Sequence, residues 1–233
     1  MSGVITVNEL TVVGGLAFIF IFLTLWILQT AIPRNDIAPF KQSGLALQLS
    51  GTAEKVKKVV DEENSKDRAR LKTSIRRDFI FIVGYASFFV ALGVLLSQAR
   101  TSGAVWLGLA SAVVMLVAAG FDFAENSRAW HILSLPRNSI TDDLCIRLRW
   151  YSLFKWFFFF IAIGLQSVIL LKTTMISWYT PIGIGLMLSA LVGIVGLFSH
   201  ALIPIATGIL GLSVIAIAVV LVAIPEKFMR FFS

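Results

Sequence analysis

Residues 104–126 read AVWLGLASAVVMLVAAGFDFAEN, and they are the clearest indication of the fold class. Residues 104–121 carry no charged side chain and are followed at once by a polar group, Asp122, Glu125 and Asn126. A membrane-spanning helix needs about 20 consecutive and mostly apolar residues. The stretch therefore predicts a transmembrane helix that ends close to its acidic residues.

The same pattern recurs along the chain, so we predict an all-α integral membrane protein with six transmembrane helices and a small helical cytoplasmic cap. The composition agrees, because 58% of the 233 residues are apolar and only 14% are charged. It excludes an ordinary soluble enzyme, in which about a quarter of the residues are charged, and it excludes a disordered chain. The predicted spans cover about residues 12–32, 79–96, 104–121, 150–171, 179–198 and 205–224.

Basic residues set the expected orientation. Residues 33–78 carry 11 of the 20 Lys and Arg, and residues 122–149 carry four more arginines. The positive-inside rule places both segments in the cytoplasm and the N-terminus outside. Six spans put the C-terminus outside as well, although Lys227 and Arg230 favour the other side and with it an odd number of spans. We expect a bacterial cytoplasmic or thylakoid-type membrane and no nucleic-acid partner.

The cytoplasmic segments are expected to be helical. Val56, Val59 and Val60 recur at helical spacing among charged residues, which is typical of an amphipathic helix. This helix lies on the membrane surface or packs on the protein, and we prefer packing. The third and fourth spans are predicted to extend beyond the membrane as one long hairpin whose tip covers residues 136–141, because Pro136 ends a helical pattern.

Polar side chains gather where three predicted spans meet the cytoplasm. Span two starts there, span three ends there and span four starts there, so we expect these side chains to form one layer near the interface. The three acids are expected to face Lys155, with Arg76, Arg77 or Arg128 as a further cation, so that the charges nearly balance. The predicted cluster comprises Asp78, Tyr85, Asp122, Glu125, Asn126, Tyr151 and Lys155.

Ionisable groups at membrane depth are costly and therefore informative. The simplest interpretation is a structural network of ion pairs and hydrogen bonds that fixes the bundle. There are three alternatives. The cluster could bind a lipid headgroup, an ion or a small ligand; it could be a catalytic site; or it could be part of a proton path. We predict no metal site. Any metal would bind Asp122 and Glu125, because carboxylate oxygens are suitable ligands for a hard divalent cation. The same two residues could instead act as an acid/base pair.

The last two spans carry a different signal. Gly185, Ser189 and Gly193 follow one another at four-residue intervals, and small residues so placed let two helices approach closely. We interpret them as a packing seam between spans five and six, with a seam to another subunit as the alternative. Only a few residues around His200 and Pro204 separate these spans, so a tight hairpin and a re-entrant pair both fit.

Several of these motifs resemble a family of uncharacterised bacterial multi-pass membrane proteins. The resemblance rests on Leu47–Val56 with its LxLxG pattern, on Asp78 and Tyr85 in one span, on the glycine and DxxEN of Gly120–Asn126, and on Lys155 in the next span. It covers about residues 44–160. It implies that the polar residues form one site, and it implies no activity.

We expect a non-catalytic polytopic membrane protein, a subunit or a lipid- or ligand-binding component of a membrane assembly. Its expected partners are the lipid bilayer and another membrane protein or a second copy of the chain. Two alternatives stay open. One is a membrane-embedded enzyme that acts on a prenyl or phospholipid-like substrate through Asp122 and Glu125, and the other is a proton- or cation-coupled transporter. The sequence identifies no cofactor.

Overall fold

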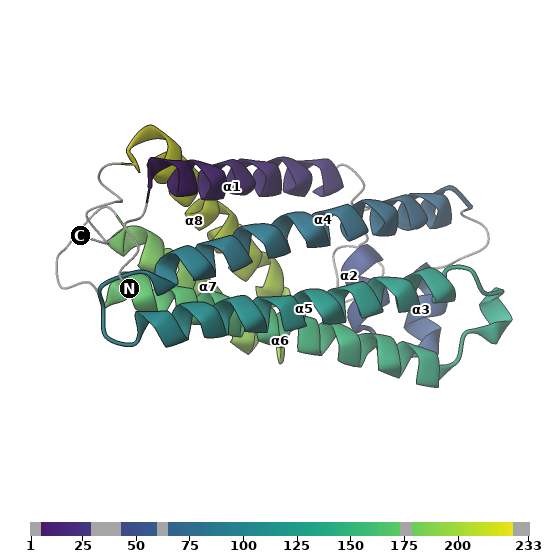
Figure 1. Cartoon of the computed structure of the whole chain (residues 1–233). Helices are drawn as coiled ribbons and strands as arrows, with labels where there is room; N and C mark the ends of the chain where they lie inside the picture. Colours follow the sequence, from purple (N-terminus) through teal and green to yellow (C-terminus); the bar gives the residue numbers. More distant parts are fainter. Residues whose placement is uncertain (1–5, 29–42, 60–64, 173–178, 226–233) are drawn as a thin grey trace.

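The structure is a computed structural model that describes residues 6–28, 43–59, 65–172 and 179–225, and every regular element among them is helical. Short 3-10 turns, Arg137–Ser139 and His200–Leu202, join consecutive helices. The predicted all-α class is therefore confirmed for this part of the chain. The helices are α1 Val7–Leu28, α2 Ser43–Leu49, α3 Ala53–Val59, α4 Ser65–Ser97, α5 Ala104–Ile132, α6 Asp142–Leu171, α7 Thr180–Gly196 and α8 Ile203–Ala223 (Figure 1).

Among the described residues, five helices, α1, α4, α5, α6 and α8, are long and apolar enough to cross a membrane, as in a multi-pass membrane protein. The prediction of six spans is wrong, because α7, the predicted fifth span, has only 17 residues. Pro181 lies in its first turn and the chain leaves the helix after Gly196. Its rise of about 26 Å is shorter than an apolar layer of about 30 Å.

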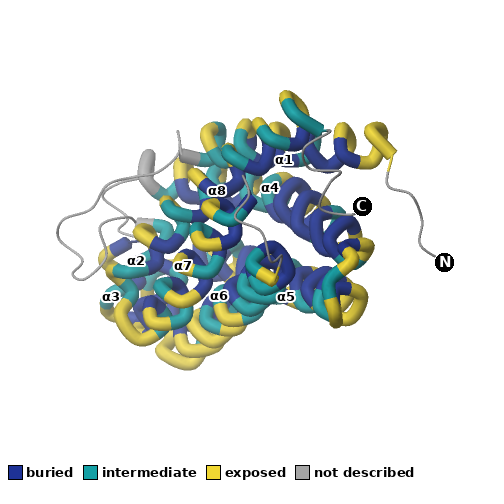
Figure 2. The backbone as a smooth tube through the Cα atoms, turned by 90° about the vertical axis from the view of Figure 1, so that its left-hand side faces the viewer, coloured by how far each residue is buried: buried dark blue, intermediate teal, exposed yellow. Residues whose placement is uncertain are grey.

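The six apolar helices of the described ranges form a closed ring. Each packs against the next in the order α1, α4, α5, α6, α7 and α8, and α8 returns to α1. Viewed along the bundle, the buried residues face the inside of the ring and the exposed ones face outward (Figure 2). Any site between these helices is therefore enclosed on several sides by protein.

Two apolar clusters stabilise the molecule. The larger fills the ring and includes Phe88, Phe89 and Phe160, none of which is exposed. The smaller joins α2 and α3 to the end of the bundle where the 3-10 turn connects α5 to α6, here called the hairpin end. Val56 and Val59 on α3 are buried in it, so this amphipathic helix packs on the protein. Val60 lies outside the described residues.

Polar contacts fix the hairpin end. The Arg68 side chain on α4 donates hydrogen bonds to the carbonyl oxygens of Leu133, at 2.7 Å, and of Leu135. Asp142, the first residue of α6, accepts a hydrogen bond from the Ala53 N–H at 2.6 Å through its Oδ1. The Arg68 contacts join α4 to the end of α5, and the contact of Asp142 holds α3 beside the start of α6.

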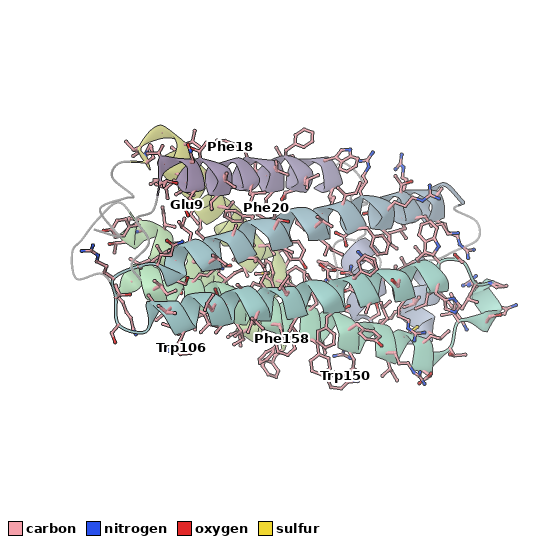
Figure 3. The ribbon with its side chains drawn as sticks, in the orientation of Figure 1. Glu9, Phe18, Phe20, Trp106, Trp150 and Phe158 are labelled. Atoms are coloured by element: carbon pink, nitrogen blue, oxygen red, sulfur yellow. The ribbon has the colours of Figure 1, made fainter. Side chains whose placement is uncertain are left out.

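The outer surface of the ring is apolar. Phe18 on α1, Trp106 on α5 and Trp150 on α6 point away from the bundle, whereas Phe20 points into it (Figure 3). Trp106 is 78% exposed and Phe20 is 6% exposed. A surface of large exposed apolar side chains needs lipid around it, which agrees with a bilayer environment.

Candidate functional site

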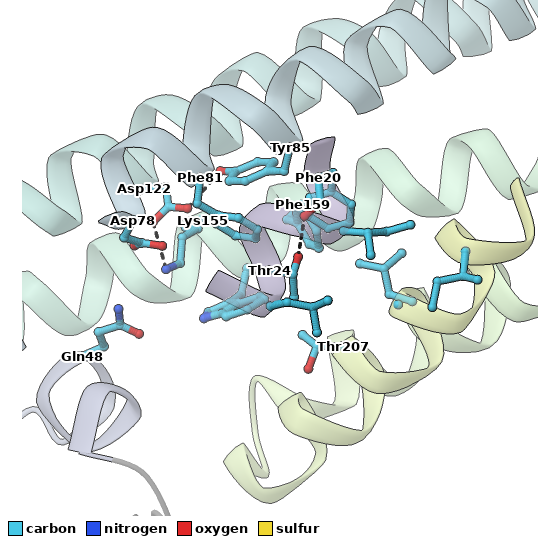
Figure 4. Close-up of a pocket in the computed structure, with 16 residues that line it drawn as sticks. Phe20, Thr24, Gln48, Asp78, Phe81, Tyr85, Asp122, Lys155, Phe159 and Thr207 are labelled. Atoms are coloured by element: carbon cyan, nitrogen blue, oxygen red, sulfur yellow. Dashed lines mark hydrogen bonds and ion pairs between the residues drawn. The ribbon is translucent and has the colours of Figure 1, made fainter. Parts of the chain in front are cut away.

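Three helices bring most of the predicted polar residues together at one level of the bundle. Asp78 and Tyr85 come from α4, and Lys155 comes from α6; Figure 4 shows them side by side with Asp122 of α5. The inner face of α5 also supplies Glu125 and Asn126, whose spacing places them above Asp122 on the same side of the helix.

Lys155 lies between two acids of α5. Its Nζ is 3.1 Å from Asp122 Oδ1 and 2.7 Å from Glu125 Oε2. The Tyr85 hydroxyl donates a hydrogen bond of 2.9 Å to Asp122 Oδ2. All four side chains are buried, so this network is an internal one.

Asp78 stands apart from this network. Its Oδ2 accepts a hydrogen bond of 2.8 Å from Asn126 Nδ2. Unlike Asp122 and Glu125, Asp78 is only partly buried, and it lines a cavity in the bundle. The cluster therefore has an enclosed part around Lys155 and an accessible part at Asp78.

The arginines expected to balance the acids point elsewhere. The Arg76 guanidinium lies 5.1 Å from the centre of the Trp130 ring. Arg77 lies over Trp26 of α1, at 4.7 Å, and donates a hydrogen bond of 3.1 Å to its carbonyl oxygen. Arg128 is exposed. Long side chains near a membrane interface reach aromatic rings and water more easily than a buried acid.

Tyr151 also lies outside the cluster. The buried face of α6 follows Leu148, Ser152, Lys155 and Phe159, and Tyr151 stands at the edge of that face. Its ring contacts Phe121 instead, at a centroid distance of 6.4 Å. One helical turn separates Tyr151 from Lys155, but the 40° offset over four residues is enough to direct it away.

A cavity of about 330 Å³ adjoins the cluster. Asp78, Tyr85, Asp122 and Lys155 form its polar wall. The opposite wall comes from α1 and α8 and is mostly apolar. Figure 4 shows that these walls face each other across the bundle. The remaining lining residues are Phe20, Ile21, Thr24, Leu25, Gln48, Phe81, Trp156, Phe159, Thr207, Leu210, Gly211 and Ile215.

Sequence reasoning missed several of these residues. Thr24 and Thr207 are polar residues within apolar runs, and this pattern could have identified them from the sequence. Both also donate hydrogen bonds to carbonyl oxygens of their own helices, which is the common role of threonine in such runs. Gln48 lies between the buried Leu47 and Leu49, and only the fold shows that α2 directs it toward the cavity (Figure 4).

The cavity reaches the outer surface of the bundle between α1 and α8. Leu25 on α1 and Ile215 on α8 both line it, and they are 59% and 46% exposed. Near the opposite end of the bundle the two helices touch, since a side chain at Gly14 would meet Leu221 and Val222. Figure 1 shows α8 crossing the bundle obliquely. This tilt separates α8 from α1 at the level of the cluster.

The small residues of α7 pack inside the chain. A Cβ at Gly185 would meet Ser213 of α8, and Ser189 Oγ donates a hydrogen bond of 2.9 Å to the Ala206 carbonyl oxygen. Gly193 faces the ring of Phe160 on α6. The seam therefore joins α7 to both of its neighbours in the ring.

Within the described ranges, no three His, Cys, Asp or Glu side chains are arranged to hold a metal ion. The chain matches no protein-family model, no curated protein and no solved structure. The interpretation of the site therefore depends on its own geometry.

Proposed function

We propose that this protein binds an amphipathic molecule within the membrane and does so as a non-catalytic component of a membrane assembly. The observation that carries the proposal is the cavity of about 330 Å³, which has charged and hydroxyl groups on one side and apolar side chains of α1 and α8 on the other. Ligand sites are typically apolar cavities with a few polar groups that fix the orientation of the ligand.

The depth of the polar wall suits such a ligand. Asp122 lies 18 residues after Ala104, the first residue of α5, which is about 27 Å along the helix. An apolar layer is about 30 Å thick, so the polar wall lies near its edge. We further propose that the hairpin end is cytoplasmic, because Lys and Arg concentrate there. The ligand would then enter from the inner leaflet, between α1 and α8.

The alternatives have less support. An enzyme that uses Asp122 and Glu125 together needs both carboxylates at the substrate, but Glu125 is 0% exposed and does not line the cavity. Carriers commonly bind their substrate near the middle of the membrane, between repeated halves. The charged wall of the cavity described here lies near one edge of the apolar layer instead.

Filling the cavity tests the proposal. Gly211 lines the cavity and has no atom within 4 Å of the position of an added Cβ, so Gly211→Leu places a side chain in the ligand's space without a backbone clash. Gly208 has the same open surroundings, lies on α8 one turn earlier and does not line the cavity. Gly208→Leu is therefore the matched control.

The measurement is native mass spectrometry of the gently extracted full chain. We expect the unaltered protein and Gly208→Leu to carry a bound amphipathic molecule, and Gly211→Leu to lose it. The proposal fails if Gly211→Leu retains the same bound mass, or if the unaltered protein carries none.

A further inference from the structure

We propose that the molecule bound in this cavity carries a positively charged ammonium group, and that Asp78 is the side chain that binds it. The inference rests on the proposed function and specifies the ligand. It distinguishes a long-chain amine or quaternary ammonium compound from a phosphate-bearing lipid.

The first support is the balance of charge around the cavity. Asp78, Asp122 and Glu125 bring three carboxylates to one layer, and Lys155 brings one ammonium. Arg76 and Arg77, the nearest arginines along α4, are directed to tryptophan rings. In the part of the chain that the structure describes, the site therefore holds more acidic than basic groups, which opposes an anionic ligand.

The second support is the position of Asp78. Both ion pairs of Lys155 are made with Asp122 and Glu125. Asp78 has only the Asn126 amide as a hydrogen-bond donor among the described side chains, and it retains accessible surface in the cavity. The charge of Lys155 also acts on Asp78, but its ion pairs are with the other two acids, so a partly buried carboxylate at this position gains from a further, direct cationic partner. A ligand ammonium group next to Asp78 supplies that partner.

The third support is independent of the acids. Aromatic faces attract cations, and quaternary ammonium groups are commonly held by several rings at once. The Phe81 and Tyr85 rings are 5.4 Å apart, and the Tyr85 and Phe159 rings are 5.6 Å apart, so they form one continuous group. Figure 4 shows Phe81 and Tyr85 close to the wall that carries Asp78, Asp122 and Lys155. The aromatic lining residues are Phe20, Phe81, Tyr85, Trp156 and Phe159.

The test compares three probes that share one alkyl chain and differ in charge: dodecyltrimethylammonium, dodecyl phosphate and dodecanol. Each is titrated into the purified full chain in a neutral maltoside detergent, and the bound fraction is counted by native mass spectrometry. We expect the unaltered protein to bind the ammonium probe at least tenfold more tightly than the phosphate probe. This ranking needs no variant, so it does not depend on the folding of one.

The role of Asp78 is tested by Asp78→Asn, which removes the charge and keeps the size. We expect at least a tenfold loss of affinity for dodecyltrimethylammonium and an unchanged affinity for dodecanol. Asp143→Asn is the matched control, because Asp143 is exposed on α6, where it pairs with Arg147 away from the cavity. It should leave the binding of all three probes unchanged.

The outcomes separate the two proposals. Equal binding of all three probes, or tighter binding of dodecyl phosphate, overturns the ammonium ligand and leaves the cavity as a site for amphipathic molecules. An unchanged affinity in Asp78→Asn overturns the role of Asp78. If none of the probes binds to the unaltered protein, the proposed function fails together with the inference.

Discussion

Two regions of the ring are held together by different chemistry. Charged groups join α4, α5 and α6, where Lys155 lies between Asp122 and Glu125. Small residues join α7 to its neighbours, as at Ser189 and Gly193. The first kind of contact depends on charge and direction, and the second depends on space. Changes of charge should therefore destabilise the first region most, and changes of side-chain size the second.

The largest expected effect is that of Lys155→Met, which leaves two buried carboxylates without their cation. Removing one partner of a buried ion pair destabilises a protein by about 3–5 kcal/mol. The free energy of unfolding, measured by denaturant titration in detergent micelles, should fall by that amount. Lys172→Met is the control, because Lys172 is exposed and should cost less than about 0.5 kcal/mol. Similar values for the two variants would contradict the role given to Lys155.

A change of size in the other region should have an intermediate effect. Gly193→Val places a branched side chain against the fully buried ring of Phe160, and overpacking of this kind costs about 1–3 kcal/mol. The same measurement applies. Gly211→Val is the control, since its surroundings are open. A stability equal to that of Gly211→Val would show that α6 and α7 do not pack as described.

Removing one hydrogen bond from each region gives a third comparison, and Ser189→Ala has the smallest expected effect of all these variants apart from the controls. Tyr85→Phe removes a donor to the Asp122 carboxylate, and bonds to charged groups contribute about 1.5–3 kcal/mol. Ser189→Ala removes a donor to a backbone carbonyl between α7 and α8, where about 0.6 kcal/mol is typical of membrane helices. Tyr85→Phe should therefore lose more stability. A larger loss of stability in Ser189→Ala than in Tyr85→Phe would contradict the distinction between the two regions.

The sequence predicted those features that depend on one helix at a time. Asp122, Glu125 and Asn126 interrupt an apolar run at helical spacing, so their shared face follows from the chain alone. The long hairpin of α5 and α6 and the inward position of Lys155 follow from the same periodicity and from the order of the spans. The clustering of these residues was therefore expected.

The features that depend on how the helices pack against one another could not be predicted from the sequence. Arg77 was one of three arginines considered as a partner of the acids, but it contacts Trp26 on α1, and only the packing of α1 on α4 brings these two residues together. The cavity exists because α8 tilts away from α1, which no local pattern records. The length of α7 was overestimated because hydropathy alone does not show where a helix begins and ends. Here Pro181 marks its first turn, and the chain turns after Gly196.

The hydrogen bond between Ala53 and Asp142 can form only late in the synthesis of the protein. Its partners lie 89 positions apart. A ribosome adds about 5–20 residues per second, so α3 exists for roughly 5–20 s before the start of α6 is made. During this interval Val56 and Val59 have no docking surface on α6. The nascent chain therefore passes through a stage in which this apolar face is open to chaperones or to the bilayer surface.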